Sequence, residues 1–235
     1  MYLREFISPP ANIPYHEIPI IINNFNRLEY LKILLDGLEK RNYTNIYILD
    51  NQSTYPPLLD FYKATKHHVI FLEKNYGFRA LWKSKLYKKF TGNYFVYTDS
   101  DLEIIDDCPE NFLEIFRNKL TNDKMCSKVG FSLKIDDLPD HYNQKQTVIA
   151  WEKKFYSKPS LDKKYYKAPI DTTLALYRPY SFKHIRSEHS KIYRAAAPFQ
   201  VKHLPWYIDD NNLSEENQYY ISTSNQQSTW FQHLK

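Results

Sequence analysis

The sequence predicts an α/β fold in which a mostly parallel sheet is flanked by helices and followed by a more irregular second half. Short apolar, β-branched runs alternate with amphipathic segments through the first 135 residues. This alternation is typical of right-handed crossovers between parallel strands. Four of the runs also end in polar residues, which a parallel sheet would bring to one edge. The 235 residues, 43% hydrophobic, suit a single domain over 1–235.

Five strands are expected in the first half, because each run is short, apolar and rich in β-branched or aromatic residues. They cover residues 18–22, 46–49, 69–72, 94–97 and 129–135. A further strand over 172–177 is expected to be antiparallel or to lie at an edge. The stretch between residues 136 and 168 is polar, aromatic and weakly periodic, and it is expected to hold one helix near 147–155.

Four helices are expected between these strands. The first follows Asn26, which can act as its N-cap with Glu29 as the capping-box partner, and it buries a leucine face. The second begins at Pro56 and runs to about residue 66, since proline is tolerated in a first turn. The third covers about 78–90. The fourth is expected to be capped by Asp107.

Composition excludes several classes of protein. Two cysteines, Cys108 and Cys126, are too few for a disulfide framework and lack metal-ligand spacing. No signal peptide and no apolar run of about 18 residues is visible, which favours a cytoplasmic protein. The net charge of +5 fits an anionic substrate or peripheral association with an acidic membrane. Nucleic acid is not an expected partner, because no basic stripe is concentrated on one element. The oligomeric state stays open.

The pair Asp99 and Asp101 follows the apolar run at 94–97 directly. A buried strand that ends in two aspartates places carboxylate oxygens at the carboxyl edge of the sheet, where open α/β sheets bind ligands. Carboxylates are preferred ligands of hard cations, and such cations hold phosphates. The pair therefore predicts a site for a cation and a phosphate.

Polar residues follow the other three early strands as well. They are Asn24, Asn26 and Arg27; Asp50, Asn51 and Ser53; and Asn75, Gly77 and Arg79. Each is ordinary in a turn or cap when taken alone. Amide and carboxylate groups also hydrogen-bond a base or ribose, and arginine pairs with phosphate. Their recurrence after four strands predicts one ligand site at this edge.

Three segments carry a resemblance to a known family. The sequences at 20–27 (IIINNFNR), 47–53 (YILDNQS) and 97–101 (YTDSD) together resemble the GT-A nucleotide-sugar glycosyltransferases, specifically family-2-like members. The resemblance covers roughly residues 18–105, which would form the donor half, with an acceptor half over about 128–235. It implies transfer from a nucleotide-diphosphate sugar to a glycan or lipid-linked acceptor, with Mn²⁺ or Mg²⁺.

The resemblance also implies roles for individual residues. Asp50 would accept a hydrogen bond from the base, while Asn26 and Arg27 would line the nucleotide pocket. Asp99 would contact the ribose or the metal shell, and Asp101 would bind the metal. His203, in the C-terminal part, is the expected third ligand. The remaining edge residues are expected to contact the nucleotide sugar: Asn24, Asn51, Asn75 and Arg79.

The catalytic base cannot be carried over by motif, because the chain departs from the commonest family pattern after residue 135. Asp171, just before the strand at 172–177, is the first candidate. Asp137 is the second. Asp136, next to Asp137, is the third candidate, and Glu152 and Glu188 are weaker ones. A retaining mechanism would need no such base.

Two other functions stay open. A sugar-1-phosphate nucleotidyltransferase uses a similar sheet and metal, but the loop after the first strand lacks the glycines such enzymes carry, and the chain has only four glycines. A non-catalytic carbohydrate-binding protein is the other, although the intact Asp99 and Asp101 argue against it.

Overall fold

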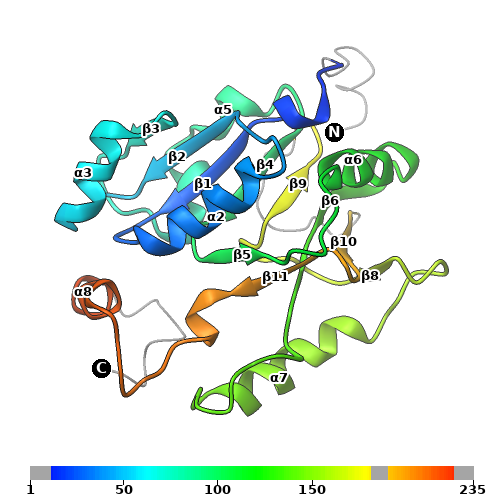
Figure 1. Cartoon of the computed structure of the whole chain (residues 1–235). Helices are drawn as coiled ribbons and strands as arrows, with labels where there is room; N and C mark the ends of the chain where they lie inside the picture. The colour runs from blue at the N-terminus through cyan, green and yellow to red at the C-terminus, as the bar shows by residue number, and fades with distance from the viewer. Residues whose placement is uncertain (1–11, 181–189, 225–235) are drawn as a thin grey trace.

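An eight-stranded mixed sheet organises the protein (Figure 1), whose computed structural model describes residues 12–180 and 190–224. The strand order is β3-β2-β1-β4-β9-β6-β10-β8. Four neighbouring strands are mutually parallel: β1 (Ile20–Asn24), β2 (Ile46–Asp50), β3 (His68–Phe71) and β4 (Phe95–Asp99). They form the expected parallel half of the sheet.

The second half of the sheet is mixed. β9 (Ala175–Tyr177) lies between β4 and β6 (Cys126–Gly130) and is antiparallel to both. β10 (Lys191–Ala195) is parallel to β6, and β8 (Tyr165–Lys167) closes the sheet as an antiparallel edge. The strand expected over 172–177 is therefore antiparallel, and it lies inside the sheet. Gly130 permits the close approach of β6 and β9, since a Cβ there would lie 2.6 Å from the Cβ of Ala175.

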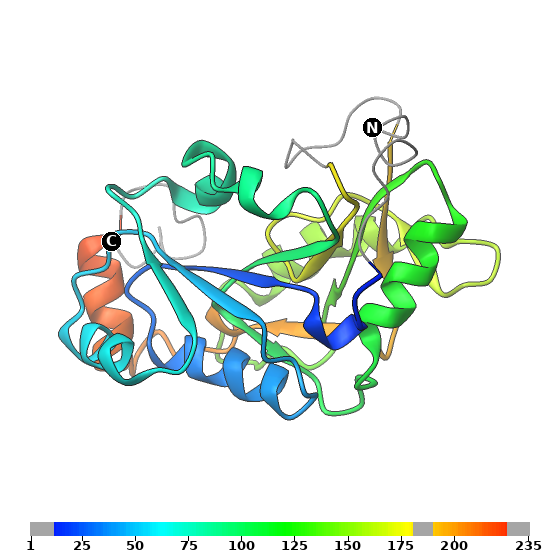
Figure 2. The same cartoon turned by 90° about the horizontal axis from the view of Figure 1, so that it is seen from above.

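Each face of the large sheet carries its own core, because side chains alternate along a strand. Ile20, Ile22 and Val96 pack with α2 (Glu29–Glu39) and α6 (Phe112–Asn122). Ile21 and Phe95 pack on the opposite face with the short helices α4 (Ala80–Lys83) and α5 (Tyr87–Phe90). Figure 2 shows α2 and these short helices on opposite sides of the sheet.

A second, three-stranded sheet has the order β5-β11-β7. It consists of β5 (Leu102–Ile104), β11 (Gln200–His203) and β7 (Ser132–Leu133). The single strand expected over 129–135 is thus two strands, β6 and β7, in different sheets. Pairing of His203 with Leu102 brings the C-terminal part of the chain beside Asp99, at the end of β4, and Asp101, just after it.

The remaining elements are α3 (Pro56–Ala64), α7 (Lys145–Lys153), α8 (Glu215–Thr223), and the 3₁₀ turns η1 (Tyr15–Glu17), η2 (Gly77–Arg79), η3 (Lys154–Tyr156) and η4 (Leu204–Trp206). Within the described residues, no helix is long and apolar enough to cross a bilayer. Cys108 and Cys126 are buried free thiols.

Three helix predictions need correction. The helix expected over 78–90 is divided into η2, α4 and α5, and Lys85, between the last two, has a left-handed φ of 65°. The helix expected after Asp107 begins at Phe112. Asn26 does not cap α2, because its φ is 51° and the helix begins three residues later.

The N-terminus of α2 takes its acceptor from the far end of the chain instead. The carboxylate of Glu216 in α8 accepts hydrogen bonds from the backbone N–H groups of Leu28, at 2.6 Å, and Glu29, at 2.7 Å. A carboxylate at a helix N-terminus also complements the helix dipole. α8 is thereby fixed against the start of α2, beside α3 (Figure 1).

Candidate active site

Two cavities meet at the carboxyl end of β4. The polar cavity, of about 420 Å³, is lined by residues that include Asn23, Arg27, Asn51, Asn75, Lys83 and Tyr220. The aromatic cavity, of about 430 Å³, is lined by residues that include Arg79, Trp151, Phe155, Ile170, Arg194 and Trp206. Six residues line both: Phe78, Asp99, Asp101, Asp171, Thr172 and His203. The shared residues form the junction between the cavities.

Asp99 is held at the junction by two side chains. Asn23 Nδ2 donates to one carboxylate oxygen at 3.0 Å, and the hydroxyl of Thr172 donates to the other. The backbone N–H of Asp99 donates to the carbonyl of Thr172 at 2.9 Å. Burial, together with the negative charge of Asp101, raises the pKa of Asp99 well above its usual value. Asp99 is thus oriented by Asn23 and Thr172, while burial and Asp101 destabilise its charged form.

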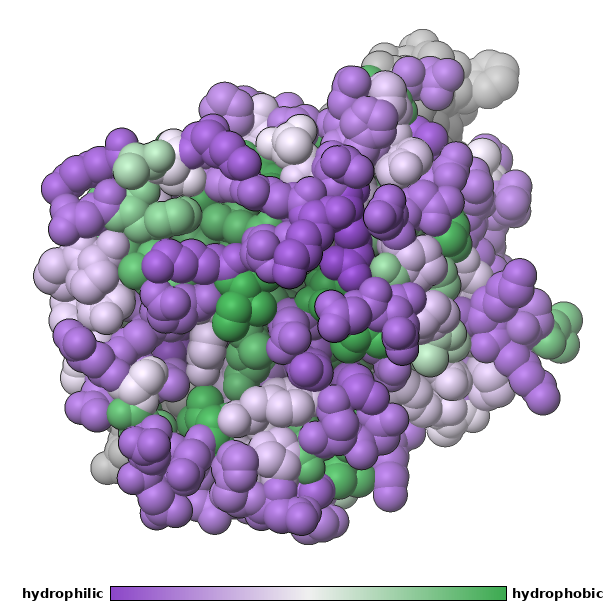
Figure 3. Space-filling view, viewed as in Figure 1, coloured by the Kyte–Doolittle hydropathy of each residue, from purple (hydrophilic) through white to green (hydrophobic). Residues whose placement is uncertain are grey.

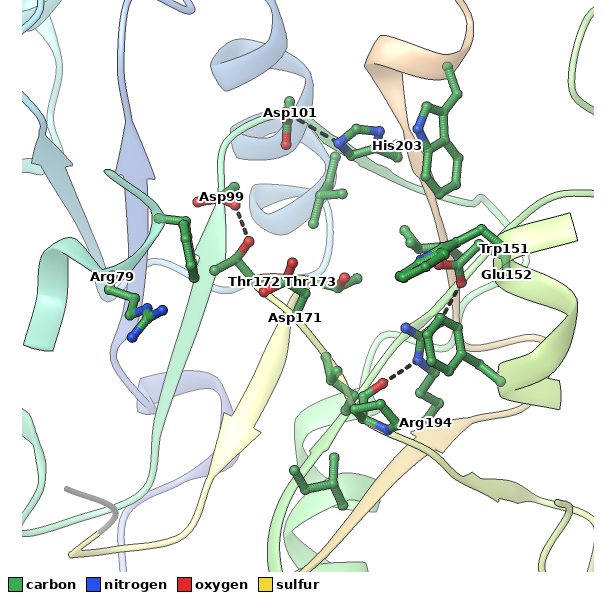
Figure 4. Close-up of a pocket in the computed structure, with 18 residues that line it drawn as sticks. Arg79, Asp99, Asp101, Trp151, Glu152, Asp171, Thr172, Thr173, Arg194 and His203 are labelled. Carbon is green, nitrogen blue, oxygen red and sulfur yellow. Dashed lines mark hydrogen bonds and ion pairs between the residues drawn. The ribbon is translucent and has the colours of Figure 1, made fainter. Parts of the chain in front are cut away.

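Asp101 faces His203 across the junction (Figure 4). Their Oδ2 and Nε2 atoms lie 3.5 Å apart, and the backbone N–H of Leu204 donates to the carbonyl of Asp101 at 2.9 Å. Burial acts to raise the pKa of Asp101, but His203 and the positive charge of Arg27 outweigh it and lower that pKa. The structure therefore brings together two residues 102 positions apart in the sequence.

These two side chains fit a divalent cation. A carboxylate oxygen and an imidazole nitrogen suit Mn²⁺, and cations of this class take further ligands from phosphates and water rather than from a complete protein cage. The described residues contain no cluster of three or more His, Cys, Asp or Glu placed to hold a metal.

Arg27 places a positive charge at the polar cavity. Its Nη1 donates to Asn217 Oδ1 at 2.5 Å, and its guanidinium lies 3.6 Å from the ring centroid of Tyr220. Both partners belong to α8, so the helix that caps α2 also orients this arginine. An arginine held in this way is suited to pair with a phosphate.

Asn51 and Asn75 shape the opposite wall of the polar cavity through the backbone of the loop before α4. Asn51 accepts from the N–H of Tyr76 at 2.7 Å and donates to the carbonyl of Gly77 at 3.2 Å. Asn75 accepts from the N–H of Gly77 at 2.8 Å. The φ of Gly77 is 68°, a conformation that glycine adopts without strain.

Three expected nucleotide contacts lie beneath the cavities. Asn24, Asn26 and Asp50 are buried and line neither cavity. Asn24 bonds the hydroxyls of Tyr62 and Ser100. Asn26 accepts from the backbone N–H of residues 54 and 55, and Asp50 accepts from that of residue 53. These three side chains hold together the loops that follow the parallel strands.

The candidate bases fall in different places. Asp171 is exposed and lines both cavities beside Thr172. Asp137 lines neither cavity, and it accepts a hydrogen bond from the hydroxyl of Tyr207 at 2.6 Å. Asp136 is exposed and forms an ion pair with Lys134. Glu188 lies outside the described residues.

Glu152 forms a buried ion pair at the floor of the aromatic cavity. Its carboxylate lies 2.6 Å from Nη1 of Arg194, whose Nε donates to the carbonyl of Pro169 at 2.7 Å (Figure 4). Both side chains are about 5% exposed or less. Glu152 is therefore engaged with an arginine inside the protein, which makes it a poor candidate for the catalytic base.

Sequence reasoning missed Asn23, Thr172 and Lys128. Lys128 Nζ donates to the carbonyl of Ile170 at 2.6 Å and lies 3.2 Å from the hydroxyl of Tyr177, which supports the segment that carries Asp171. Burial lowers the pKa of Lys128 to about 7. Its position directly before the expected strand at 129–135 was the only signal in the sequence.

The family model described as Glycosyl transferase family 2 matches residues 20–186. A search of curated proteins found no match.

Among solved structures, the chain is similar to GalNAc-T7 in complex with UDP, GalNAc and Mn²⁺, with 14% identity, a TM-score of 0.47, and coverage of 79% of this chain and 43% of that one. It is also similar to S. aureus TarS, with 16% identity, a TM-score of 0.40, and coverage of 68% and 28%. A third similar structure is a cytidylyltransferase from Leptospira borgpetersenii, with 13% identity, a TM-score of 0.37, and coverage of 57% and 70%. The chain thus spans less than half the length of the first two.

Proposed function

The chain belongs to glycosyl transferase family 2, and we propose that it transfers a sugar from a nucleotide-diphosphate sugar to a glycan or lipid-linked acceptor. The observation that carries this proposal is the pair of cavities that share Asp99, Asp101, Asp171 and His203. A transferase needs two substrates to meet at one reacting centre, and here two cavities of similar size open onto the same carboxylates.

The donor occupies the polar cavity in this proposal. The asparagines of its wall offer amide groups to the nucleoside, and Arg27 and Lys83 offer positive charge to the diphosphate. Asp101 and His203 would hold Mn²⁺ or Mg²⁺, which when bound neutralises the charge that develops on the diphosphate leaving group. Asp99, oriented by Asn23 and Thr172, lies beside them.

The acceptor occupies the aromatic cavity, and Asp171 acts as the general base. Its carboxylate takes the proton of the acceptor hydroxyl, whose oxygen forms a bond to the anomeric carbon as the bond from that carbon to the diphosphate oxygen breaks. The electron pair leaves with the diphosphate. Exposure of Asp171 at the junction supports this role, because both substrates reach it.

Nucleotide-sugar binding and turnover test the proposal. A panel of nucleotide sugars with and without Mn²⁺ is compared by thermal shift, and slow hydrolysis of the best donor is then measured. We expect one donor to raise the melting temperature in the presence of metal. Asp101→Ala removes a proposed cation ligand and should reduce hydrolysis by about a hundredfold or more.

The base assignment has a matched control in Asp137→Asn, which makes the same change at a residue outside both cavities. Asp171→Asn should abolish transfer to an acceptor while leaving donor binding intact, and Asp137→Asn should behave as the wild type. Loss of transfer in Asp137→Asn alone would reverse the assignment. Release of pyrophosphate from a nucleoside triphosphate and a sugar phosphate would instead establish a nucleotidyltransferase.

A further inference from the structure

A cationic surface lies next to the aromatic cavity. We define the lysine patch as residues 151–167, which run from the end of α7 through η3 to the edge strand β8. It contains six lysines, all of them exposed: Lys153, Lys154, Lys158, Lys163, Lys164 and Lys167. Only two acids accompany them. Glu152 is buried against Arg194, and Asp162 accepts bonds from its own turn.

The tip of the lysine patch is an aliphatic side chain. Leu161 stands in the turn between η3 and β8 with a relative exposure of 107%, so nothing in the described structure covers it. Trp151, at the other end of the patch, is 54% exposed, with the ammonium of Lys154 3.0 Å from its ring centroid. The loop before β8 projects from the body of the protein in Figure 1, and Figure 3 shows a small hydrophobic projection among hydrophilic residues on that side.

The patch is held in place rather than loosely attached. The backbone N–H of Ser160 donates to the carbonyl of Tyr165, and that of Lys167 donates to the carbonyl of Lys158 at 2.9 Å. The hydroxyl of Tyr156 donates to the carbonyl of Leu133. The bond to Leu133 and the pairing of β8 with β10 connect the patch to both sheets. They position its backbone relative to the aromatic cavity, of which Trp151 is a wall.

We propose that the lysine patch docks on the surface of an anionic lipid bilayer. Lysines near such a surface are attracted to its negative charge, while a leucine and a tryptophan suit the boundary between headgroups and acyl chains. Docking through this patch would place the aromatic cavity beside the membrane, where a lipid-linked acceptor resides. This second step rests on the proposed function, whereas the docking itself does not.

The chemistry of the patch favours a bilayer over a nucleic acid. Single-stranded nucleic acids bind to exposed aromatic platforms on which bases stack. In the patch, Phe155, Tyr156 and Tyr166 are only half-exposed, and the most exposed apolar group is the leucine at the tip. Trp151 is the one aromatic ring of the patch that is mostly exposed, and the ammonium of Lys154 lies at 3.0 Å from its centroid. A single ring at one end and an aliphatic tip at the other suit insertion beside lysines better than the stacking of successive bases.

The test is co-sedimentation of the full chain with vesicles. Vesicles of pure phosphatidylcholine are compared with vesicles of phosphatidylcholine and phosphatidylglycerol in equal parts. We expect binding to the anionic vesicles, weakened by salt, and none to the neutral ones. Replacing Lys158, Lys163 and Lys164 with glutamine should lower the affinity about a hundredfold, since each lysine near the surface contributes about fivefold. Leu161→Ser should lower it about tenfold or more.

Matched controls carry the same changes elsewhere. Lys40, Lys63 and Lys88 are exposed lysines outside the patch, and Ile33 is an exposed aliphatic residue on α2. The control triple variant replaces these three lysines with glutamine, and the control for Leu161→Ser is Ile33→Ser. Both controls should bind anionic vesicles as the wild type does. Equal loss in both triple variants would overturn the proposal, because net charge alone would then explain binding. Absence of vesicle binding, or binding of a single-stranded RNA probe in its place, would overturn it as well.

Failure of docking and failure of the proposed function give different results. The patch variants should retain the donor hydrolysis and thermal stability of the wild type in solution, since no changed residue lines the polar or the aromatic cavity. Vesicle binding without any nucleotide-sugar binding would leave the docking surface standing and refute the proposed function. Donor hydrolysis without vesicle binding would support the proposed function and refute the docking surface.

Discussion

Replacing Lys128 with methionine should remove a pH-dependent contribution to stability. Burial lowers the pKa of Lys128 from the usual 10.5 to about 7, even though Asp171 acts in the opposite direction. Because the folded pKa lies below the unfolded one, the unfolded chain binds more protons between these two values. The wild-type protein therefore becomes more stable as pH rises through this window, and Lys128→Met lacks the effect.

The size of the effect follows from the two pKa values. At pH 9 the folded lysine is almost fully neutral, and at pH 7 it is half protonated, while the unfolded lysine is charged at both. One pKa unit corresponds to about 1.4 kcal/mol, so the wild type gains roughly 2 kcal/mol between pH 7 and pH 9. Below pH 6 both states are protonated and the contribution is constant.

Urea unfolding of both proteins, followed by tryptophan fluorescence at pH 5, 6, 7 and 9, measures this difference. Tyrosines and cysteines that also titrate are shared by the two proteins and cancel in the comparison. We subtract the unfolding free energy of Lys128→Met from that of the wild type at each pH. This difference should rise by roughly 2 kcal/mol from pH 7 to pH 9 and change little from pH 5 to pH 6. A difference that is constant across this range would refute the assignment of a neutral, buried lysine.

Two further changes test packing and capping. Glu216→Ala should lower the unfolding free energy by about 1–2 kcal/mol, because it removes the acceptor of the first N–H groups of α2; urea midpoints measure this, and an unchanged midpoint would contradict the capping role. Gly130→Ala should cost about 1–3 kcal/mol, since its Cβ would lie 2.6 Å from that of Ala175. Gly92→Ala, with nothing within 4 Å, is the matched control and should stay within about 0.5 kcal/mol.

The parallel half of the fold was predictable because three of its four strands, β1, β2 and β4, are almost entirely buried. Runs such as Ile20–Ile22 are apolar without interruption, as is typical of a strand whose two faces are both covered by helices. The arrival of Asp99 and Asp101 at one edge with Arg27 and Asn51 follows from the parallel order alone. Local sequence was sufficient there.

The remaining features depend on partners distant in the sequence. Asn26 has the side chain of an N-cap, but Glu216 supplies the acceptor from 188 residues beyond Leu28. The insertion of β9 between β4 and β6 depends on Gly130, whose missing side chain matters only when Ala175 is already opposite. No periodicity within either segment encodes such a pairing, so the strand order in the second half of the sheet could not be derived, although an antiparallel strand at 172–177 was expected.

The capping of α2 by α8 has a consequence for the order in which the protein is made. A ribosome that adds about 5–20 residues per second needs roughly 10–40 s to pass from Leu28 to Glu216. During that time the first turn of α2 has no carboxylate to accept its N–H groups, and Arg27 has no Tyr220 beneath it. The polar cavity is therefore completed late in synthesis, after the sheet that supports it.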